Sequence, residues 1–309
     1  MDIFAQQIAN GLILGSVYAL IALGYTMVYG IIGLINFAHG EITMVGAMLT
    51  ITALNILIGA DLNLSPILLV ICALSISLPL CMLLGYGIER IAYRPLRNAP
   101  KLAPLITAIG VSIVLQNLAM MIWGRGYQPF PAILPNDNIE FLGAQLTPIK
   151  IAIVVISTVV LIGLWILVNK TRLGRAMRAT AQNPQVAILM GVNINHVISS
   201  TFILGSALAA LAGTMVGANY GQADPYMGFL LGLKAFSAAV LGGIGNLQCA
   251  VLGGLLLGLI ESLGAGYIGN LTGGFLGSNY QDIFAFVVLI LVLVLRPSGL
   301  LGERVAERA

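Results

Sequence analysis

Long apolar runs, separated by short polar stretches, dominate the chain. Nine of them approach the length of a membrane span: 3–30, 41–59, 64–90, 102–123, 149–169, 197–218, 228–246, 248–268 and 281–296. A transmembrane helix needs about 20 predominantly apolar residues. Because the seventh run ends in glycines and contains Lys234, we expect it to be broken or re-entrant. The pattern predicts an all-α integral membrane protein, a polytopic bundle of about eight or nine transmembrane segments.

Composition supports a membrane location for the whole chain. Of 309 residues, 59% are hydrophobic and only 8% are charged, whereas a soluble domain carries about 25% charged residues. So few charges cannot cover a water-facing surface, but a lipid-facing surface can stay apolar. No stretch is charged enough to form a separate soluble domain, so residues 1–309 are expected to form one domain. Nucleic-acid binding is a poor fit, because no basic patch is interleaved with aromatic residues.

Basic residues gather between particular runs and thereby predict the orientation. They cluster in three places: Arg90, Arg94, Arg97 and Lys101; Lys170, Arg172, Arg175 and Arg178; Arg296, Arg304 and Arg308. By the positive-inside rule these regions are cytoplasmic, and the proline-rich loop at about 124–148, with its single arginine, faces outside. The first seven residues contain no lysine or arginine. Their absence favours an uncleaved, external N-terminus, which requires nine spans, over an internal one, which requires eight.

The end of the first run is interrupted in an unusual way. Between Gly24 and Glu41, apolar residues alternate with Asn36, His39 and several glycines. Polar groups at membrane depth are costly and usually face a cavity or one another. One interpretation is therefore a helix break that lines a solute path. The other is a turn at the membrane surface, with Glu41 in the first turn of the next helix, where the helix dipole favours an acid.

Lys234 lies deep inside the seventh apolar run, with no acid near it in sequence. It must face water, pair with an acid on another helix, or reach the membrane surface as a snorkelling anchor. Glu261 and Glu41 are the candidate partners. The glycines that follow, Gly242 and Gly243 among them, do not form a dinucleotide-binding fingerprint, because the third glycine and the strand–helix unit are missing.

The cytoplasmic loop at about 170–196 is longer than a tight turn needs. It predicts a short basic helix up to about Gln182, a break at Asn183, and a second helix ended by Gly191. Apolar residues are mixed with basic ones along it. That mixture suits docking onto a soluble partner, and the alternative is an interfacial helix held by anionic lipid.

Small residues recur in two patterns. Glycines four positions apart predict close helix crossings, and the pairs are Gly11/Gly15, Gly213/Gly217, Gly228/Gly232 and Gly254/Gly258. Internal packing is the preferred interpretation over dimerisation. In addition, Leu-Gly-Ser at 14–16, followed by Ala19 and Ala22, recurs at 204–206 with Ala209 and Ala212. This indicates either an internal duplication, common in transporters, or chance similarity.

Signatures of enzymes and metal sites are missing from the sequence. There is no phosphate-binding Gly-x-x-x-x-Gly-Lys-Ser/Thr loop and no Gly-x-Ser-x-Gly elbow, so the chain is not expected to hydrolyse ATP or to be an enzyme. Its histidines, His39 and His196, stand far apart. The cysteines, Cys72, Cys81 and Cys249, lie in apolar runs without metal-ligand spacing. We expect neither a metal site nor a cofactor in this chain.

Five segments together resemble a known family. They are GYTMVYGIIGLINFAHGE at 24–41, ERIAYRPLR at 89–97, LGRAMR at 173–178, GVN at 191–193 and KAFSAAVLGGIG at 234–245. The chain is similar, nearly from end to end, to the permease subunits of ABC importers for branched-chain amino acids, specifically to the LivH-type half of the permease pair. It departs from the Glu-Ala-Ala…Gly pattern of many ABC importers, because it has Ala179-Thr180-Ala181 in the cytoplasmic loop.

The resemblance implies a permease domain of ABC-importer type with broken or re-entrant helices, in the bacterial inner membrane. It further implies a second, homologous permease subunit, two cytoplasmic ATP-binding subunits that use the ATP, and a periplasmic solute-binding protein. Urea and short-chain amide importers have related permeases, so these solutes stay open as alternatives. An ATP-independent channel, an ion-coupled carrier and a membrane scaffold are alternatives from other classes.

With this resemblance, the candidate residues take roles in transport. The predicted substrate path comprises Asn36, His39, Glu41, Lys234, Gly242, Gly243 and Glu261. The predicted contacts with an ATP-binding subunit are Arg172, Gly174, Arg175, Arg178, Asn183 and Gly191. Broken-helix ends offer backbone donors and acceptors to a zwitterionic solute. Alternating access, driven by ATP binding in the partner subunits, is the expected mechanism.

Overall fold

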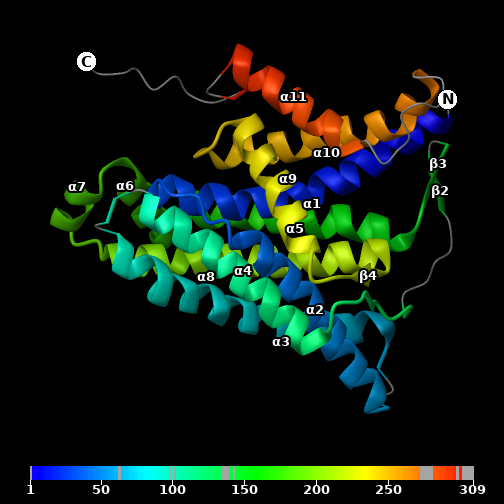
Figure 1. Ribbon diagram of the computed structural model, residues 1–309, viewed down its shortest axis with the longest axis horizontal. Helices are drawn as coiled ribbons and strands as arrows, with labels where there is room; N and C mark the ends of the chain where they lie inside the picture. Colours follow the sequence, from blue (N-terminus) through cyan, green and yellow to red (C-terminus); the bar gives the residue numbers. More distant parts are fainter. Residues whose placement is uncertain are drawn as a thin grey trace.

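The computed structural model shows an elongated bundle of helices (Figure 1). It describes residues 2–61, 64–97, 99–100, 102–133, 139–141, 143–271, 281–296 and 299–300. Three basic residues used above for the orientation lie outside the described residues: Lys101, Arg304 and Arg308.

Helices make up most of the described chain. They are α1 (Asp2–Ile32), α2 (His39–Gly59), α3 (Pro66–Ile88), the π-helix η1 (Glu89–Tyr93), the 3-10 turn η2 (Arg94–Leu96), α4 (Leu102–Trp123), α5 (Pro148–Lys170), α6 (Arg172–Gln182), α7 (Pro184–Leu189), α8 (Ile194–Tyr220), α9 (Met227–Gly242), α10 (Leu247–Leu271) and α11 (Gln281–Leu295). Four short strands form two antiparallel pairs, β1 (Gln128–Pro129) with β4 (Gln222–Ala223) and β2 (Ile139–Phe141) with β3 (Ala144–Leu146).

The helices coincide with the nine apolar runs. Within the described residues, seven are long and apolar enough to cross a membrane, and α9 and the last part of α11 are shorter apolar helices. The predicted all-α, polytopic architecture is confirmed, with a span count that remains approximate. The seventh run was expected to be broken, and it is helical only to Gly242. Gly243 has a φ of +122°, a left-handed conformation that favours glycine and ends α9 there.

The predicted basic segments and the N-terminus lie at opposite ends of the bundle (Figure 1). The α3–α4 connection and α6–α7 lie at one end, where Arg97 donates a hydrogen bond to Asn195 at the beginning of α8, at 2.6 Å (Figure 1). The N-terminus lies at the opposite end, where the side chain of Gln6 exchanges hydrogen bonds of 2.8 and 3.2 Å with the backbone of Gln145. This is the placement that an external N-terminus and a cytoplasmic basic end require.

Each of the four predicted glycine pairs lies in a contact between helices of this chain. The pairs on α1 and α10 face each other, the pair on α8 faces α2, and the pair on α9 faces the beginning of α2. A methyl group on Gly15 would come within 2.7 Å of the Leu255 Cα, and one on Gly254 within 2.6 Å of the Ala19 Cα. Internal packing, the preferred interpretation of these pairs, is confirmed.

The two Leu-Gly-Ser triplets occur in equivalent settings. They lie in α1 and α8, which run through the bundle in opposite directions (Figure 1). Each helix leads into a short turn and a shorter helix, α2 or α9, and each packs along another long helix, α1 on α10 and α8 on α3. This is the geometry of an inverted repeat, and it favours duplication over chance similarity.

Candidate functional site

The interrupted segment at 24–41 forms a true break between α1 and α2. Gly33, with a φ of +70°, donates its amide to the Tyr29 carbonyl and ends α1. The Asn36 side chain then accepts the Ala38 amide at 3.1 Å, which organises the turn that starts α2 at His39. Asn36 is 2% exposed, so the turn buries a polar side chain that is satisfied locally.

The end of the break and the beginning of α2 lie inside the bundle. The His39 ring packs edge-on against Tyr25, with ring centroids 4.9 Å apart, and a methyl group on Gly24 would collide with it. A methyl group on Gly205, in the middle of α8, would lie 3.6 Å from the same ring. The structure therefore combines both interpretations: the break begins at the exposed Gly33 and ends at depth, where α2 begins with the buried His39. It also has the predicted acid, Glu41, in the first turn of α2.

Glu41 lies where the beginnings of α2 and α9 meet. Its side chain is buried, and one carboxylate oxygen accepts a hydrogen bond from Ser112 of α4 at 3.0 Å. The other oxygen faces Gly228, whose added methyl group would lie 2.5 Å away, and has no hydrogen-bond partner among the described residues. Two helix N-termini thus converge on one buried carboxylate, a polarity that the helix dipoles favour.

Lys234 is the centre of a separate buried cluster. Its ammonium group lies 2.8 Å from Glu261 on α10 and 2.7 Å from Asp282 on α11, and 5.9 Å above the Tyr18 ring. The Tyr18 hydroxyl donates to the second oxygen of Glu261 at 2.9 Å. The prediction of Glu261 as a partner is confirmed. Glu41 forms no ion pair with Lys234, and the lysine is an internal partner rather than a surface anchor.

Gly242 and Gly243 are in a third place, at the end of α9. A methyl group on Gly242 would collide with the Cys249 carbonyl of α10, so this glycine permits a close crossing. Gly243 supplies the left-handed turn that ends the helix. The structure therefore divides the predicted path residues into three groups, and their role in a path stays a prediction.

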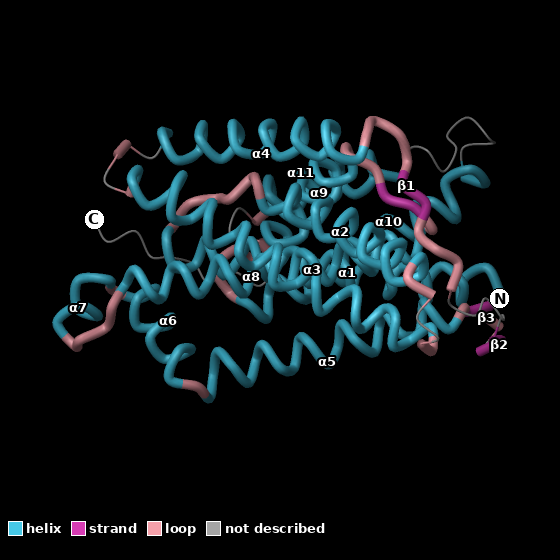
Figure 2. The backbone as a smooth tube through the Cα atoms, turned by 90° about the horizontal axis from the view of Figure 1, so that it is seen from below, coloured by secondary structure: helices cyan, strands magenta, loops and turns pink. Residues whose placement is uncertain are grey.

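The segment at about 170–196, which is predicted to be cytoplasmic, has the predicted helix–break–helix form and projects beyond the end of the bundle (Figure 2). Asn183 separates α6 from α7, and its side chain accepts two amides of α7 at 3.0 and 3.1 Å. Gly191 follows with a φ of +81°. Gly174 packs against the Val168 carbonyl, and Arg178 donates to that carbonyl at 2.6 Å. These residues shape the segment.

The remaining residues of the segment supply its exposed surface. Arg172 and Arg175 are exposed on α6. At the tip, Leu189 and Met190 are 84% and 79% exposed. Large apolar side chains at that level of exposure beside basic ones are typical of an interaction surface.

A cavity of about 90 Å³ lies between this segment and the bundle, where α1, α5, α6 and the α9–α10 turn meet. Its lining includes Gly30, Met177 and Gly245. Thr26 also lines it, and the Thr26 hydroxyl has no hydrogen-bond partner among the described residues. Movement of α6 would therefore change the volume of this cavity directly.

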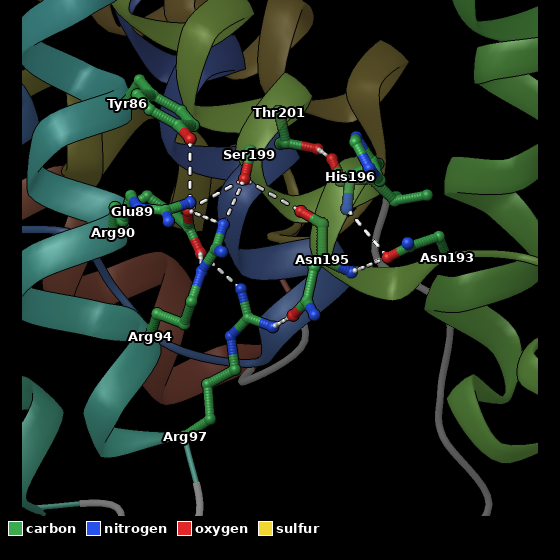
Figure 3. A network of polar contacts seen from close by, with 11 residues as sticks. Tyr86, Glu89, Arg90, Arg94, Arg97, Asn193, Asn195, His196, Ser199 and Thr201 are labelled. Atoms are coloured by element: carbon green, nitrogen blue, oxygen red, sulfur yellow. Dashed lines mark hydrogen bonds and ion pairs between the residues drawn. The ribbon is translucent and has the colours of Figure 1, made fainter.

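A buried polar network at the end of α3 is the main feature that sequence reasoning missed (Figure 3). Glu89 has no exposed side-chain surface. Its carboxylate accepts from Arg94 at 2.8 and 3.2 Å, from Ser199 of α8 at 2.9 Å, and from Arg97. A carboxylate among arginines within a few positions was a signal, but it was interpreted only as part of a basic cytoplasmic cluster.

Comparison with known proteins assigns the chain to a family. Residues 7–293 match the family described as branched-chain amino acid transport system / permease component. The chain belongs to this family. Within the family, the transport permease BraD of Pseudomonas aeruginosa is 45% identical over 99% of this chain and 98% of its own length. LivH of Escherichia coli is 42% identical over 99% and 97%, and a probable LivH of Methanocaldococcus jannaschii is 29% identical over 97% and 94%.

Membership of the family confirms the predicted resemblance and the general role. The chain is a multi-pass membrane permease of the ABC-importer type, and its family consists of transport components. Such permeases work with ATPase and binding-protein components.

Proposed function

We propose that this chain is one permease subunit of an importer for branched-chain amino acids in the bacterial inner membrane. The observation that carries the proposal is the similarity, over almost the whole chain, to two proteins named as permeases of high-affinity branched-chain amino acid transport. Its partners are a second, homologous permease subunit, two cytoplasmic ATP-binding subunits and a periplasmic solute-binding protein. ATP is used by the partner subunits, and this chain needs no cofactor.

The break between α1 and α2 is the proposed wall of the substrate path. The converging N-termini of α2 and α9 favour the carboxylate of an amino acid. The oxygen of Glu41 without a hydrogen-bond partner among the described residues would accept its ammonium group, and Asn36 and His39 hold the turn that positions Glu41. Lys234 and Glu261 form a second polar element of the path. Gly242 and Gly243 end α9, the helix that carries Lys234.

The α6–α7 segment is the proposed contact with an ATP-binding subunit. Arg172, Arg175 and Arg178 offer positive charge, and the exposed apolar tip offers a surface to bury. Gly174, Asn183 and Gly191 give the segment its shape. ATP binding in the partners would displace this segment and alternate the access of the path.

The test is uptake by the reconstituted complex. Proteoliposomes that contain both permeases and both ATP-binding subunits, with binding protein outside, should accumulate radiolabelled leucine only when ATP is enclosed. Leucine uptake by this chain alone would support a channel or carrier, and uptake of urea or acetamide in preference to leucine would replace the proposed substrate. Glu41→Gln should lower leucine uptake about tenfold, as expected for loss of one charged hydrogen bond. Glu140→Gln, an exposed control on β2, should not.

A further inference from the structure

The π-helix η1 places two buried polar side chains on one short element. Glu89 and Tyr93 are its first and last residues, and both are buried, whereas Arg90 and Ile91 between them are exposed. A π-helix inserts an extra residue into a helical turn, and such turns are rare and frequently occur at functional sites. Here the turn ends an otherwise regular span and presents Glu89 to one neighbour and Tyr93 to another.

Glu89 connects η1 to the beginning of α8. Ser199, in the second turn of α8, donates to its carboxylate at 2.9 Å, and Arg94 donates to the Ser199 hydroxyl at 2.8 Å (Figure 3). Arg97 binds Glu89 and Asn195, in the first turn of α8. Since α8 follows α7 after only a short turn, the α6–α7 segment continues directly into the part of α8 that this network holds.

Tyr93 connects the same element to the helix break. Its hydroxyl donates to the Asn36 side-chain oxygen at 2.9 Å, and that oxygen also accepts the Ala38 amide at 3.1 Å. The Tyr93 ring packs against Phe202 of α8, with centroids 5.2 Å apart. The tyrosine is thus anchored on α8 and holds the turn that begins α2.

We propose that Glu89 and Tyr93 are positioning residues that transmit movement of the α6–α7 segment to the break at 33–38. The inference rests on the proposed function, because it needs α6–α7 to be the coupling segment. Its physical basis is the cost of unpairing buried polar groups. Because both links are costly to break, η1, the beginning of α8 and the turn before α2 move as one unit. A displacement of the α6–α7 segment therefore also moves the turn at 33–38, in the proposed path.

The experiment compares Tyr93→Phe, Glu89→Gln and the double variant in the complete complex. Tyr93→Phe keeps the ring and removes only the hydroxyl. We expect the basal ATPase rate to stay within twofold of wild type, and the leucine imported per ATP hydrolysed to fall about fivefold, the effect of one buried hydrogen bond. Tyr86→Phe is the matched control, because its hydroxyl, on α3, accepts a hydrogen bond from the exposed Arg90 at 3.1 Å. The Tyr86→Phe variant should import as much leucine per ATP hydrolysed as wild type.

The double variant and amide hydrogen exchange distinguish a role in transmitting movement from a role in stability alone. If the two residues act in series, the double variant is no worse than the more affected single variant. In wild type, a non-hydrolysable ATP analogue should change amide exchange of the peptide covering 33–38, and this change should be lost in both single variants. Additive effects, normal coupling in Tyr93→Phe, or an unaltered exchange change in the variants would each overturn the proposal. Amide exchange is informative even if a variant is less stable, because each variant is compared with itself with and without nucleotide.

Failure of the inference differs from failure of the proposed function. If wild type imports leucine with ATP and the variants do so equally well, only the positioning role is wrong. If wild type does not import leucine, the proposed function is wrong.

Discussion

Replacing Lys234 with Met tests whether the buried ion cluster holds α9 in the bundle. The variant keeps the length and apolar stem of the side chain but removes the ammonium group. Glu261, whose side chain is 1% exposed, would then retain only the Tyr18 hydroxyl among the cluster contacts described above. Asp282, with 37% of its side chain exposed, can instead turn to solvent or the membrane surface.

The size of the effect follows from these exposures. Leaving one member of a buried ion pair without its partner costs about 3–5 kcal/mol, and this value applies to Glu261. The exposed pair with Asp282 adds only about 0–1 kcal/mol. Each kcal/mol shifts the melting temperature by about 2–4 °C for a domain somewhat smaller than this one. Lys234→Met should therefore melt roughly 6–24 °C below wild type, by the same relation.

Thermal unfolding of the detergent-solubilised protein, followed as the loss of its monodisperse gel-filtration peak, measures this change. Adding Glu261→Gln to Lys234→Met removes the unpaired charge and should restore more than half of the loss. Lys170→Met, at an exposed position at the end of α5, is the control. A melting temperature within about 2 °C of wild type for Lys234→Met, on the same scale, would refute the reasoning. If the double variant is stable but does not import leucine, Lys234 or Glu261 also acts in transport. Normal uptake by an assembled Lys234→Met complex would remove it from the path.

Three further predictions concern packing, capping and orientation. Gly254→Ala places a methyl group 2.6 Å from the α1 backbone. Because overpacking costs about 1–3 kcal/mol, the melting temperature of this variant should fall. Gly163→Ala, with open space around it, should melt like wild type. Asn183→Ala removes the acceptor for two α7 amides. Because a lost cap costs about 1 kcal/mol, proteolysis within α7 should accelerate. Unchanged cleavage would contradict the capping role. In intact spheroplasts, an impermeant maleimide should label Glu140→Cys but not Leu189→Cys, and the reverse would overturn the orientation.

Much of the fold could be predicted because lipid leaves few alternatives. Each span must satisfy its own backbone groups, so length and hydropathy suffice to predict helices. Glycine pairs could be assigned to internal crossings because membrane helices approach closely where small residues face each other. For Lys234 the candidate partners could be narrowed in advance to Glu261 and Glu41, since an ammonium group at depth needs an acid and few acids are available, and the structure shows Glu261.

Other features depend on tertiary packing that the sequence does not encode locally. The depth of the turn at 33–38 could not be inferred, because apolar residues flank a surface turn and a buried break alike. Asp282 was missed because an acid at the beginning of an apolar run is already explained by the membrane surface. Glu89 was missed because neighbouring arginines suggest a solvated cluster. Its burial depends on the packing of η1 against α8, where Ser199 donates to its carboxylate.

The short helix α9 has a consequence for how the protein is made. With 16 residues, it rises about 24 Å, less than the hydrocarbon thickness of about 30 Å, and it carries an ammonium group. Insertion of such a segment into lipid by itself is unfavourable. The carboxylates that neutralise it, Glu261 and Asp282, are synthesised later. The part of the chain from α9 to α11, residues 227–295, is therefore expected to enter the bilayer as a group, after α11 has emerged from the ribosome.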